Sequence, residues 1–224
     1  MKPVYIRDDA ESQRQHLSAV GQSLCRRGWL PGTSGSVSVR SGEAVLITVG
    51  DLDKRVMTHQ DTVMVDPFEG LPLIGEIEWP PDETAIHLAL YRRLPDCGAV
   101  IYAPALCAKA LAPLTDGSGH FGQAVLKEQE MAQTLGLSDA CLPALPVVAD
   151  RLDASLIAEE LVAALDASAA GTPPVLLIQQ NGLVTWGRDA DEALSRLERI
   201  EQLSHLFRAD AVADEPAVAR VNAR

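Results

Sequence analysis

The segment 175–187 constrains the fold most strongly, because it contains two apolar runs joined by a turn signal. Its sequence is Val-Leu-Leu-Ile-Gln-Gln-Asn-Gly-Leu-Val-Thr-Trp-Gly. Short runs rich in β-branched and large apolar residues favour strands, and Asn-Gly between two such runs is a strong signal for a tight hairpin turn. The segment therefore predicts a pair of antiparallel strands, with Asn181 at the turn between them.

A second apolar run, residues 98–105, predicts another strand with a turn at its end. Its sequence, Gly-Ala-Val-Ile-Tyr-Ala-Pro-Ala, is strand-like up to Tyr102 and then turns at Pro104 towards a helix. Active sites of layered α/β folds often form where strands end. If the turn of the hairpin lies beside this strand end, Asn181 comes close to it. Glu130 lies between the two segments in sequence, and we expect any chemistry where the three places converge.

The rest of the chain alternates between helical and strand-like patterns. Helices are expected at 9–27, 82–94, 105–112, 127–135, 154–165 and 189–208. Further strands are expected at 36–40, 44–49, 63–65 and 145–148. Ser41-Gly42 is suited to a hairpin turn, and Asp189 with Glu192 three residues later resembles the capping box of a helix start. Strand pairs mixed with helices indicate a layered α/β domain.

Length and composition narrow the class of protein. A chain of 224 residues with 47% hydrophobic residues is expected to form one large core rather than two small domains. The formal net charge of -12 disfavours nucleic acids and anionic membranes as partners. Four cysteines without a CxxC pair fit buried thiols in a reducing compartment, and no apolar run is long enough to span a bilayer. We therefore expect a cytoplasmic protein.

The residues alone leave the function open. The sequence contains no P-loop, no dinucleotide fingerprint and no HExxH motif, and its five histidines are scattered. His87 is interpreted as a core residue that packs a helix rather than as a metal ligand. Glu83 and Glu130 fall in expected helices near turns, where a glutamate is either an acid/base group or simply solvated. Thr33-Ser34-Gly35-Ser36 is either an anion-binding loop, with hydroxyl and backbone N–H donors, or an ordinary loop.

Several motifs in a fixed order resemble the class II aldolase/adducin family. The matching blocks are Gly28-Trp29 with 32–40, 47–54, 57–61, 82–92, 95–100, 129–131 and 181–187. The resemblance as a whole covers roughly residues 9–208. Within the family, the Gly-Trp loop, the Glu-Met block and the late Trp-Gly block are most similar to methylthioribulose-1-phosphate dehydratases of methionine salvage.

The resemblance, together with the two hairpin signals, predicts the architecture. We expect one three-layer α/β/α domain over residues 1–208 with a central, mostly antiparallel sheet. Residues 209–224 lack hydrophobic periodicity and are expected to form a flexible tail. Because relatives place their active sites at subunit borders, the resemblance also implies a homo-oligomer, most simply a tetramer.

The resemblance also implies a metal site, and this chain departs from it. Members of the family hold a divalent metal, usually zinc, with three histidines, whose positions correspond here to Tyr102, Pro104 and Asn181. Proline has no side-chain donor, and tyrosine and asparagine are poor zinc ligands. We therefore expect no metal and no other cofactor. The family's acid/base glutamates correspond to Glu130 in dehydratases and to Glu83 in aldolases.

The implied ligand is a small sugar-phosphate-like or other carbonyl metabolite. Its candidate contacts are Thr33, Ser34, Gly35, Ser36 and Gly50. Asp82 lies in the matching phosphate region, where a carboxylate repels a phosphate. We expect a divergent or impaired dehydratase-like protein. The alternatives are a non-catalytic structural or ligand-sensing member, and a metal-independent enzyme on another sugar-like substrate.

Overall fold

A central sheet of eight strands organises the chain in the computed structural model, which describes residues 5–104, 122–125, 144–167, 174–179 and 181–213. The strands are β1 Ser36–Ser41, β2 Ala44–Thr48, β3 Thr62–Val65, β4 Ala99–Ala103, β5 Gly122–Val125, β6 Ala144–Val148, β7 Val175–Ile178 and β8 Gly182–Gly187. Their order in the sheet is β3-β2-β1-β4-β8-β7-β6-β5. Every neighbouring pair is antiparallel except β6 and β7. The predicted mostly antiparallel sheet is confirmed.

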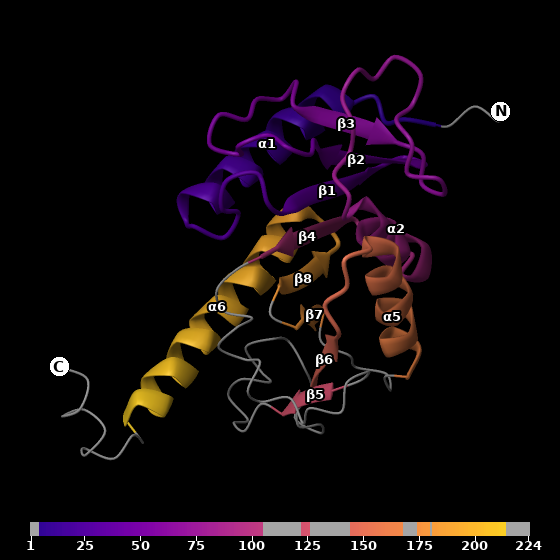
Figure 1. Ribbon diagram of the computed structural model, residues 1–224. Helices are drawn as coiled ribbons and strands as arrows, with labels where there is room; N and C mark the ends of the chain where they lie inside the picture. The colour runs from indigo at the N-terminus through magenta and orange to yellow at the C-terminus, as the bar shows by residue number, and fades with distance from the viewer. Residues whose placement is uncertain (1–4, 105–121, 126–143, 168–173, 180, 214–224) are drawn as a thin grey trace.

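Helices cover both faces of this sheet (Figure 1). They are α1 Ala10–Arg26, α2 Thr84–Arg93, α5 Ala154–Ala167 and α6 Ala190–Ala213. Apolar residues of α1 and α6 form one core with the strands, and those of α2 and α5 form a second core on the opposite face. This arrangement confirms the three-layer α/β/α architecture. No helix among the described residues combines the length and the apolar character needed to cross a membrane.

The alternation of side chains along β4 shows how the sheet separates the two cores. Ala99, Ile101 and Ala103 belong to the core under α1 and α6, whereas Val100 and Tyr102 belong to the core under α2 and α5. Successive side chains of a strand point to opposite faces. The side chain of Tyr102 therefore lies on the α2 and α5 side, one residue before β4 ends.

The predicted hairpin at the 181 turn is confirmed, and its position in the sheet matters for the site. Strands β7 and β8 pair antiparallel, with Ile178 opposite Gly182. Strand β8 also pairs with β4, with Leu183 opposite Ala103. The turn before β8 is thus held beside the end of β4, as the sequence predicted. The other expected hairpin, between β1 and β2, is confirmed as well.

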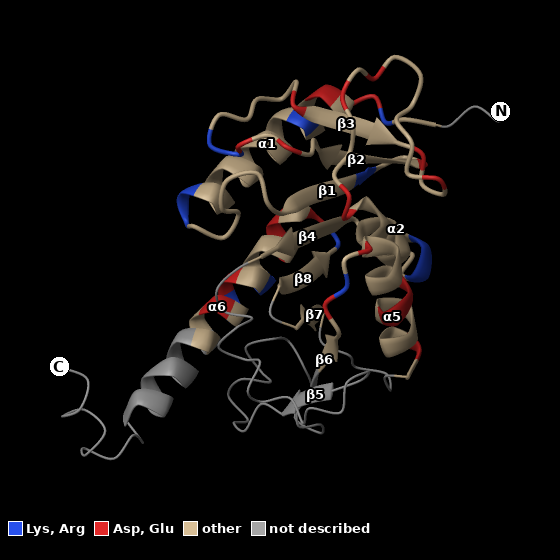
Figure 2. Ribbon diagram, viewed as in Figure 1, with Lys and Arg blue, Asp and Glu red and all other residues tan. Residues whose placement is uncertain are grey.

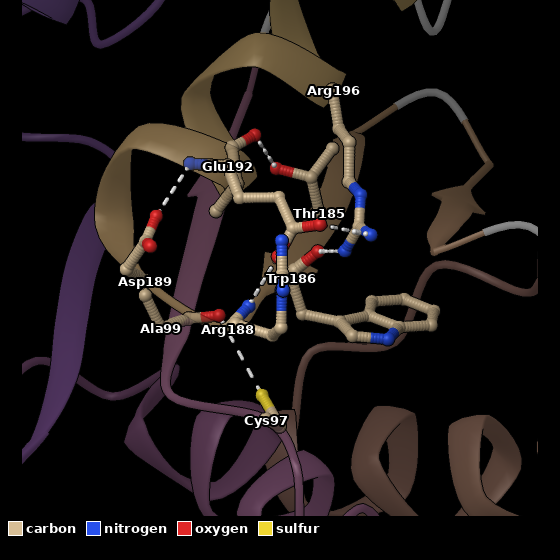
Figure 3. Close-up of polar contacts among 9 residues, drawn as sticks. Cys97, Ala99, Thr185, Trp186, Arg188, Asp189, Glu192 and Arg196 are labelled. Atoms are coloured by element: carbon tan, nitrogen blue, oxygen red, sulfur yellow. Dashed lines mark hydrogen bonds and ion pairs between the residues drawn. The ribbon is translucent and has the colours of Figure 1, made fainter. Parts of the chain in front are cut away.

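The start of α6 is tied to the end of β8 (Figure 3). Asp189 Oδ1 accepts the N–H of Glu192 at 2.8 Å, which confirms the predicted helix cap, whereas Glu192 Oε2 accepts the N–H of Arg188 at 2.7 Å, one residue before the position that a capping box uses. Arg196 donates to Glu192 Oε1 at 2.9 Å and to the carbonyl of Trp186. The helix continues to Ala213, beyond its expected end at residue 208. The alanine-rich segment after residue 208 favours helix.

Some expectations concern residues that the structure does not describe, and one strand was not expected. The predicted helices at 105–112 and 127–135 lie outside the described residues. Strand β5, Gly122–Val125, pairs with β6 at the edge of the sheet. Its sequence, Gly-Gln-Ala-Val, has a single β-branched residue, unlike the apolar runs of β3 and β7, so the sequence did not reveal it.

Gly98, directly before β4, has no room for a side chain. A Cβ atom there would lie 2.0 Å from the carbonyl oxygen of Arg188. Gly98→Ala is expected to destabilise the fold by about 2 kcal/mol, because β4 or β8 must shift. Urea denaturation measures the loss. In the control Gly21→Ala, the new Cβ meets only the flexible Sδ of Met57 at 3.1 Å. Equal stability of the two variants would contradict the prediction.

Candidate functional site

A cavity of about 330 Å³ opens where β4 ends. Its wall is formed by segments 33–35, 50–51 and 80–83, by residues of the segment 151–157, and by Tyr102, Pro104 and Asn181. The segment 80–83 leads into α2, and the segment 151–157 joins β6 to α5. The cavity is thus built from parts of the chain that are far apart in sequence.

The structure brings most of the predicted site residues together. Thr33, Ser34, Gly35, Gly50 and Glu83 all line this cavity, together with the three positions that the family resemblance assigns to metal ligands. One candidate contact lies elsewhere. Ser36 is fully buried beneath the wall, and its Oγ lies 2.9 Å from Nε2 of His87. Glu130 lies outside the described residues.

The three positions that the family resemblance assigns to zinc ligands carry side chains that do not fit zinc. Tyr102 is a buried phenol, and burial, with the nearby charges of Glu83 and Asp150, raises its pKa, so it stays neutral. Pro104 has no donor atom. Asn181 donates from Nδ2 to Asp150 Oδ1 at 3.0 Å. Since zinc prefers imidazole, thiolate and carboxylate ligands, this donor set does not fit the ion. Among the described residues no group of histidine, cysteine, aspartate and glutamate is arranged to hold a metal.

The loop 33–35 is packed tightly against the end of β4, and Gly35 makes this possible. Its φ of +82° is in the left-handed region that favours glycine. A Cβ atom at this position would lie 2.5 Å from Leu30 Cδ2 and 2.9 Å from the carbonyl oxygen of Tyr102. The backbone and hydroxyl groups of Thr33 and Ser34 are therefore held close to the Tyr102 side of the cavity.

Glu83 supplies a carboxyl group with an unusual environment. It caps α2 through its backbone, without a hydrogen bond from its side chain to the helix. Burial raises the pKa of the carboxyl group, and the charge of Asp82 adds to this rise. Hydrogen bonds from the backbone of Glu83 itself and of Gly35, and the charge of Lys54, act in the opposite direction. A carboxyl group whose pKa is raised towards working pH is suited to proton transfer.

Arg151 is a cavity residue that the sequence did not reveal. Its Nε and Nη2 donate to Glu160 Oε1 at 2.9 and 2.7 Å. Glu160 Oε2 accepts the N–H of Ala149 at 3.1 Å, so the pair is anchored to the end of β6. Arg151 is the one basic residue among the described residues of the cavity wall. No local pattern marks it, because its role depends on where the segment after β6 lies.

Acidic groups dominate the opposite wall. Asp51, Asp82 and Glu83 all line the cavity. Figure 2 shows acidic residues in red on the segment that leads into α2 and a basic residue in blue on the segment between β6 and α5. With Arg151 already paired to Glu160, the balance of charge in the cavity is negative. Such a site disfavours a doubly charged phosphate and accepts hydroxyl groups readily.

Beneath the cavity a buried hydrogen-bonded chain joins β1 to α2. His87 has no exposed surface, with Nδ1 2.7 Å from Ser38 Oγ and Nε2 close to Ser36. Ser38 Oγ also lies 2.8 Å from the hydroxyl of Tyr91. Burial lowers the pKa of His87 to about 3, so the ring is neutral. The interpretation of His87 as a core residue is confirmed.

The spacing of these residues explains why they meet. Residues four apart on a helix lie one above the other, about 6 Å apart, and residues two apart on a strand face the same side at about 6.6 Å. His87 and Tyr91 on α2 therefore match Ser36 and Ser38 on β1. The chain of hydrogen bonds fixes the position of α2, and with it the position of Glu83 at the start of this helix.

Comparisons with known proteins agree with this fold. The family described as Class II Aldolase and Adducin N-terminal domain matches residues 15–207. The methylthioribulose-1-phosphate dehydratase of Xylella fastidiosa strain 9a5c is 31% identical over 84% of this chain and 84% of its own. That of Xanthomonas campestris pv. campestris strain 8004 is 34% identical over 82% of each.

Two further comparisons are with a longer bifunctional protein and with a solved structure. A probable bifunctional methylthioribose-1-phosphate isomerase/methylthioribulose-1-phosphate dehydratase of Nocardia farcinica is 33% identical over 85% of this chain, but the match spans only 34% of that longer protein. Among solved structures, an L-fuculose 1-phosphate aldolase superposes with a TM-score of 0.72 at 20% identity, covering 91% of this chain and 88% of its own. With the family match over most of its length, the chain belongs to the class II aldolase and adducin family.

Proposed function

We propose that this chain is a divergent family member that resembles methylthioribulose-1-phosphate dehydratase but is impaired in zinc-dependent dehydration. Its cavity binds a small sugar-like carbonyl metabolite, and Glu83 and Glu130 are the candidate acid/base groups. One observation carries the proposal. The positions of the expected metal ligands converge on the cavity, yet they hold a neutral phenol, a proline and an amide that donates to Asp150.

The missing ligands matter because of what a metal contributes to such chemistry. A bound divalent ion polarises a carbonyl group as a Lewis acid, which is worth several kcal/mol when negative charge develops on the oxygen. A carboxylate such as that of Glu83 can accept a proton, but it cannot stabilise an oxyanion. The cavity therefore keeps a base while it lacks the usual electrophile.

The remaining residues are suited to binding. Thr33 and Ser34 offer hydroxyl groups, and Arg151 lies on the wall with its guanidinium oriented by Glu160. Asp51 and Asp82 make the cavity a poor place for a phosphate group. These features favour a hydroxyl-rich ligand that carries little negative charge.

A second candidate function is metal-independent catalysis on another sugar-like substrate. The observation that favours it is the buried Glu83 carboxyl group, whose pKa burial raises within a cavity. Carboxyl groups whose pKa is perturbed in a cleft are often acid/base catalysts. In this case Glu83 moves the proton, and the hydroxyl groups of Thr33 and Ser34 take the place of a Lewis acid.

An assay on methylthioribulose 1-phosphate with added zinc tests both candidates. The enzyme of Xylella fastidiosa serves as the positive control. Turnover by this chain is expected to be at least about a hundredfold lower, because losing an electrophilic group typically costs that much. Comparable turnover that disappears in Glu130→Gln would refute the impaired function. Turnover of an unphosphorylated sugar that survives chelation but is lost in Glu83→Gln would support the second candidate.

A further inference from the structure

The side chain of Lys54 is fully buried, which is unusual for a lysine. Its Nζ donates to the carbonyl oxygens of Val49 at 2.9 Å, Leu52 at 3.1 Å and Thr33 at 3.4 Å. An ammonium group has three N–H donors, so all of them are used on backbone acceptors. Lys54 does not line the cavity; it lies behind the cavity wall and contacts the loops that form it.

The three acceptors come from two different loops of the cavity. Thr33 belongs to the loop 33–35, and Val49 and Leu52 flank Gly50 and Asp51 of the other loop. The backbone N–H of Lys54 adds a further link, to the carbonyl of Gly32 at 3.3 Å. One residue therefore holds both loops, and the distance between them depends on it.

Burial lowers the pKa of the Lys54 ammonium, and nearby acidic groups counteract this. The charges of Glu83 and Asp51, which line the cavity, raise the pKa most, and the charge of Asp53 raises it less. Asp53 is already paired with Arg55. Glu83 is thus the leading counter-charge of the buried ammonium. Both groups are related to the loop 33–35, since the backbone of Gly35 acts to lower the pKa of the Glu83 carboxyl group.

We propose that Lys54 is the positioning residue of the cavity, fixing the spacing of the loops 33–35 and 49–52 and holding the Glu83 carboxylate by its charge. The role assigned to Glu83 rests on the proposed function, whereas the geometry of the two loops does not. Lys54 has no free donor for a ligand, so it is not a catalytic residue. Lys54 therefore affects the chemistry indirectly, by positioning Glu83 and the backbone of the two loops.

NMR titration of the Glu83 carboxyl carbon in the full chain tests the electrostatic part. Its resonance is assigned with Glu83→Gln. In Lys54→Met the titration midpoint of Glu83 is expected to move to higher pH, because the positive charge that stabilises its carboxylate is lost while the burial of the carboxyl group remains. In Lys54→Arg, which keeps the charge, the midpoint is expected to stay near that of the unaltered chain. Arg55→Met is the matched control, since it removes a neighbouring but exposed cation.

Amide hydrogen exchange tests the spacing of the loops. In Lys54→Met, Ser34 and Gly50 are expected to exchange faster, while amides of β7 keep their protection. An unchanged Glu83 midpoint together with unchanged exchange in Lys54→Met would overturn the proposal. Faster exchange with an unchanged Glu83 titration midpoint would overturn the electrostatic part of the proposal. Lys54 would then only hold the two loops together.

A second variant keeps the test valid if Lys54→Met does not fold. Coupling between two charges is reciprocal, so Glu83→Gln is expected to lower the pH at which the Lys54 ammonium titrates, measured by ¹⁵N NMR. Glu43→Gln, at the β1–β2 turn, serves as the control. No change in Glu83→Gln would overturn the proposal. None of these measurements needs a ligand, so failure to bind a metabolite would count against the proposed function alone.

Discussion

Replacing Tyr102, Pro104 and Asn181 together by histidine is expected to create a zinc site that holds about one metal ion per chain. The three positions line the same cavity at the end of β4. Three neutral imidazoles with one open position form a common zinc arrangement. A dissociation constant of about 1 µM, which corresponds to about 8 kcal/mol, is the expected result. The unaltered chain is expected to lose zinc on dialysis.

Elemental analysis after dialysis and calorimetric titration with zinc measure this gain. The matched control replaces the same three residues by alanine, which opens the same space without adding ligands. A single Asn181→His variant is expected to bind weakly, since one imidazole cannot hold the ion. Stoichiometric zinc in the unaltered chain, lost in Asn181→Ala, would contradict the prediction. So would a triple-histidine variant that folds but binds no zinc.

Acidification is expected to destabilise the fold through His87 by about 4 kcal/mol between pH 6.5 and pH 3. Burial lowers the pKa of this ring from 6.5 in the unfolded chain to about 3 in the folded chain. Between these values the unfolded chain binds a proton that the folded chain does not. The folded state therefore loses about 1.4 kcal/mol for each pH unit over most of this range.

Urea denaturation at several pH values measures the effect, and His87→Gln isolates it. The glutamine amide can still bond to the serine hydroxyls but does not titrate. Glu83 contributes with the opposite sign, because its pKa is raised and its folded form binds protons more readily. That contribution is the same in both chains and cancels in the comparison. An equal pH dependence of the two chains between pH 5 and pH 6.5 would show that His87 is not the cause.

Local patterns were sufficient to predict most of the fold. The hairpin at the 181 turn and the helix cap at Asp189 each depend on a few neighbouring residues, and both are confirmed. The meeting of Tyr102 and Asn181 was predictable because Tyr102 lies near the end of β4 and Asn181 directly precedes the neighbouring strand β8. The prediction that Glu83 and the loop 33–35 lie at the same place required the family resemblance, since no periodicity in the sequence relates them.

Other features depend on contacts that no local pattern contains. Lys54 looks like any surface lysine, and only the three distant carbonyls around it explain its burial. Ser36 was assigned to ligand binding, but its side chain points to the α2 side of β1, where His87 meets it. Which face of a strand meets which helix is fixed by the order of the whole sheet. For the same reason the sequence did not reveal Arg151.

The buried chain of hydrogen bonds between β1 and α2 also has a direction. The Tyr91 hydroxyl lies 2.8 Å from Ser38 Oγ, and either oxygen can donate. The neutral ring of His87 has one N–H donor and one acceptor nitrogen, so one of the hydroxyls of Ser36 and Ser38 donates to the ring and the other accepts from it. A change of the His87 tautomer therefore reverses the bonds on both sides of the ring. One end of the chain is the hydroxyl of Ser36, directly after the loop 33–35 of the cavity.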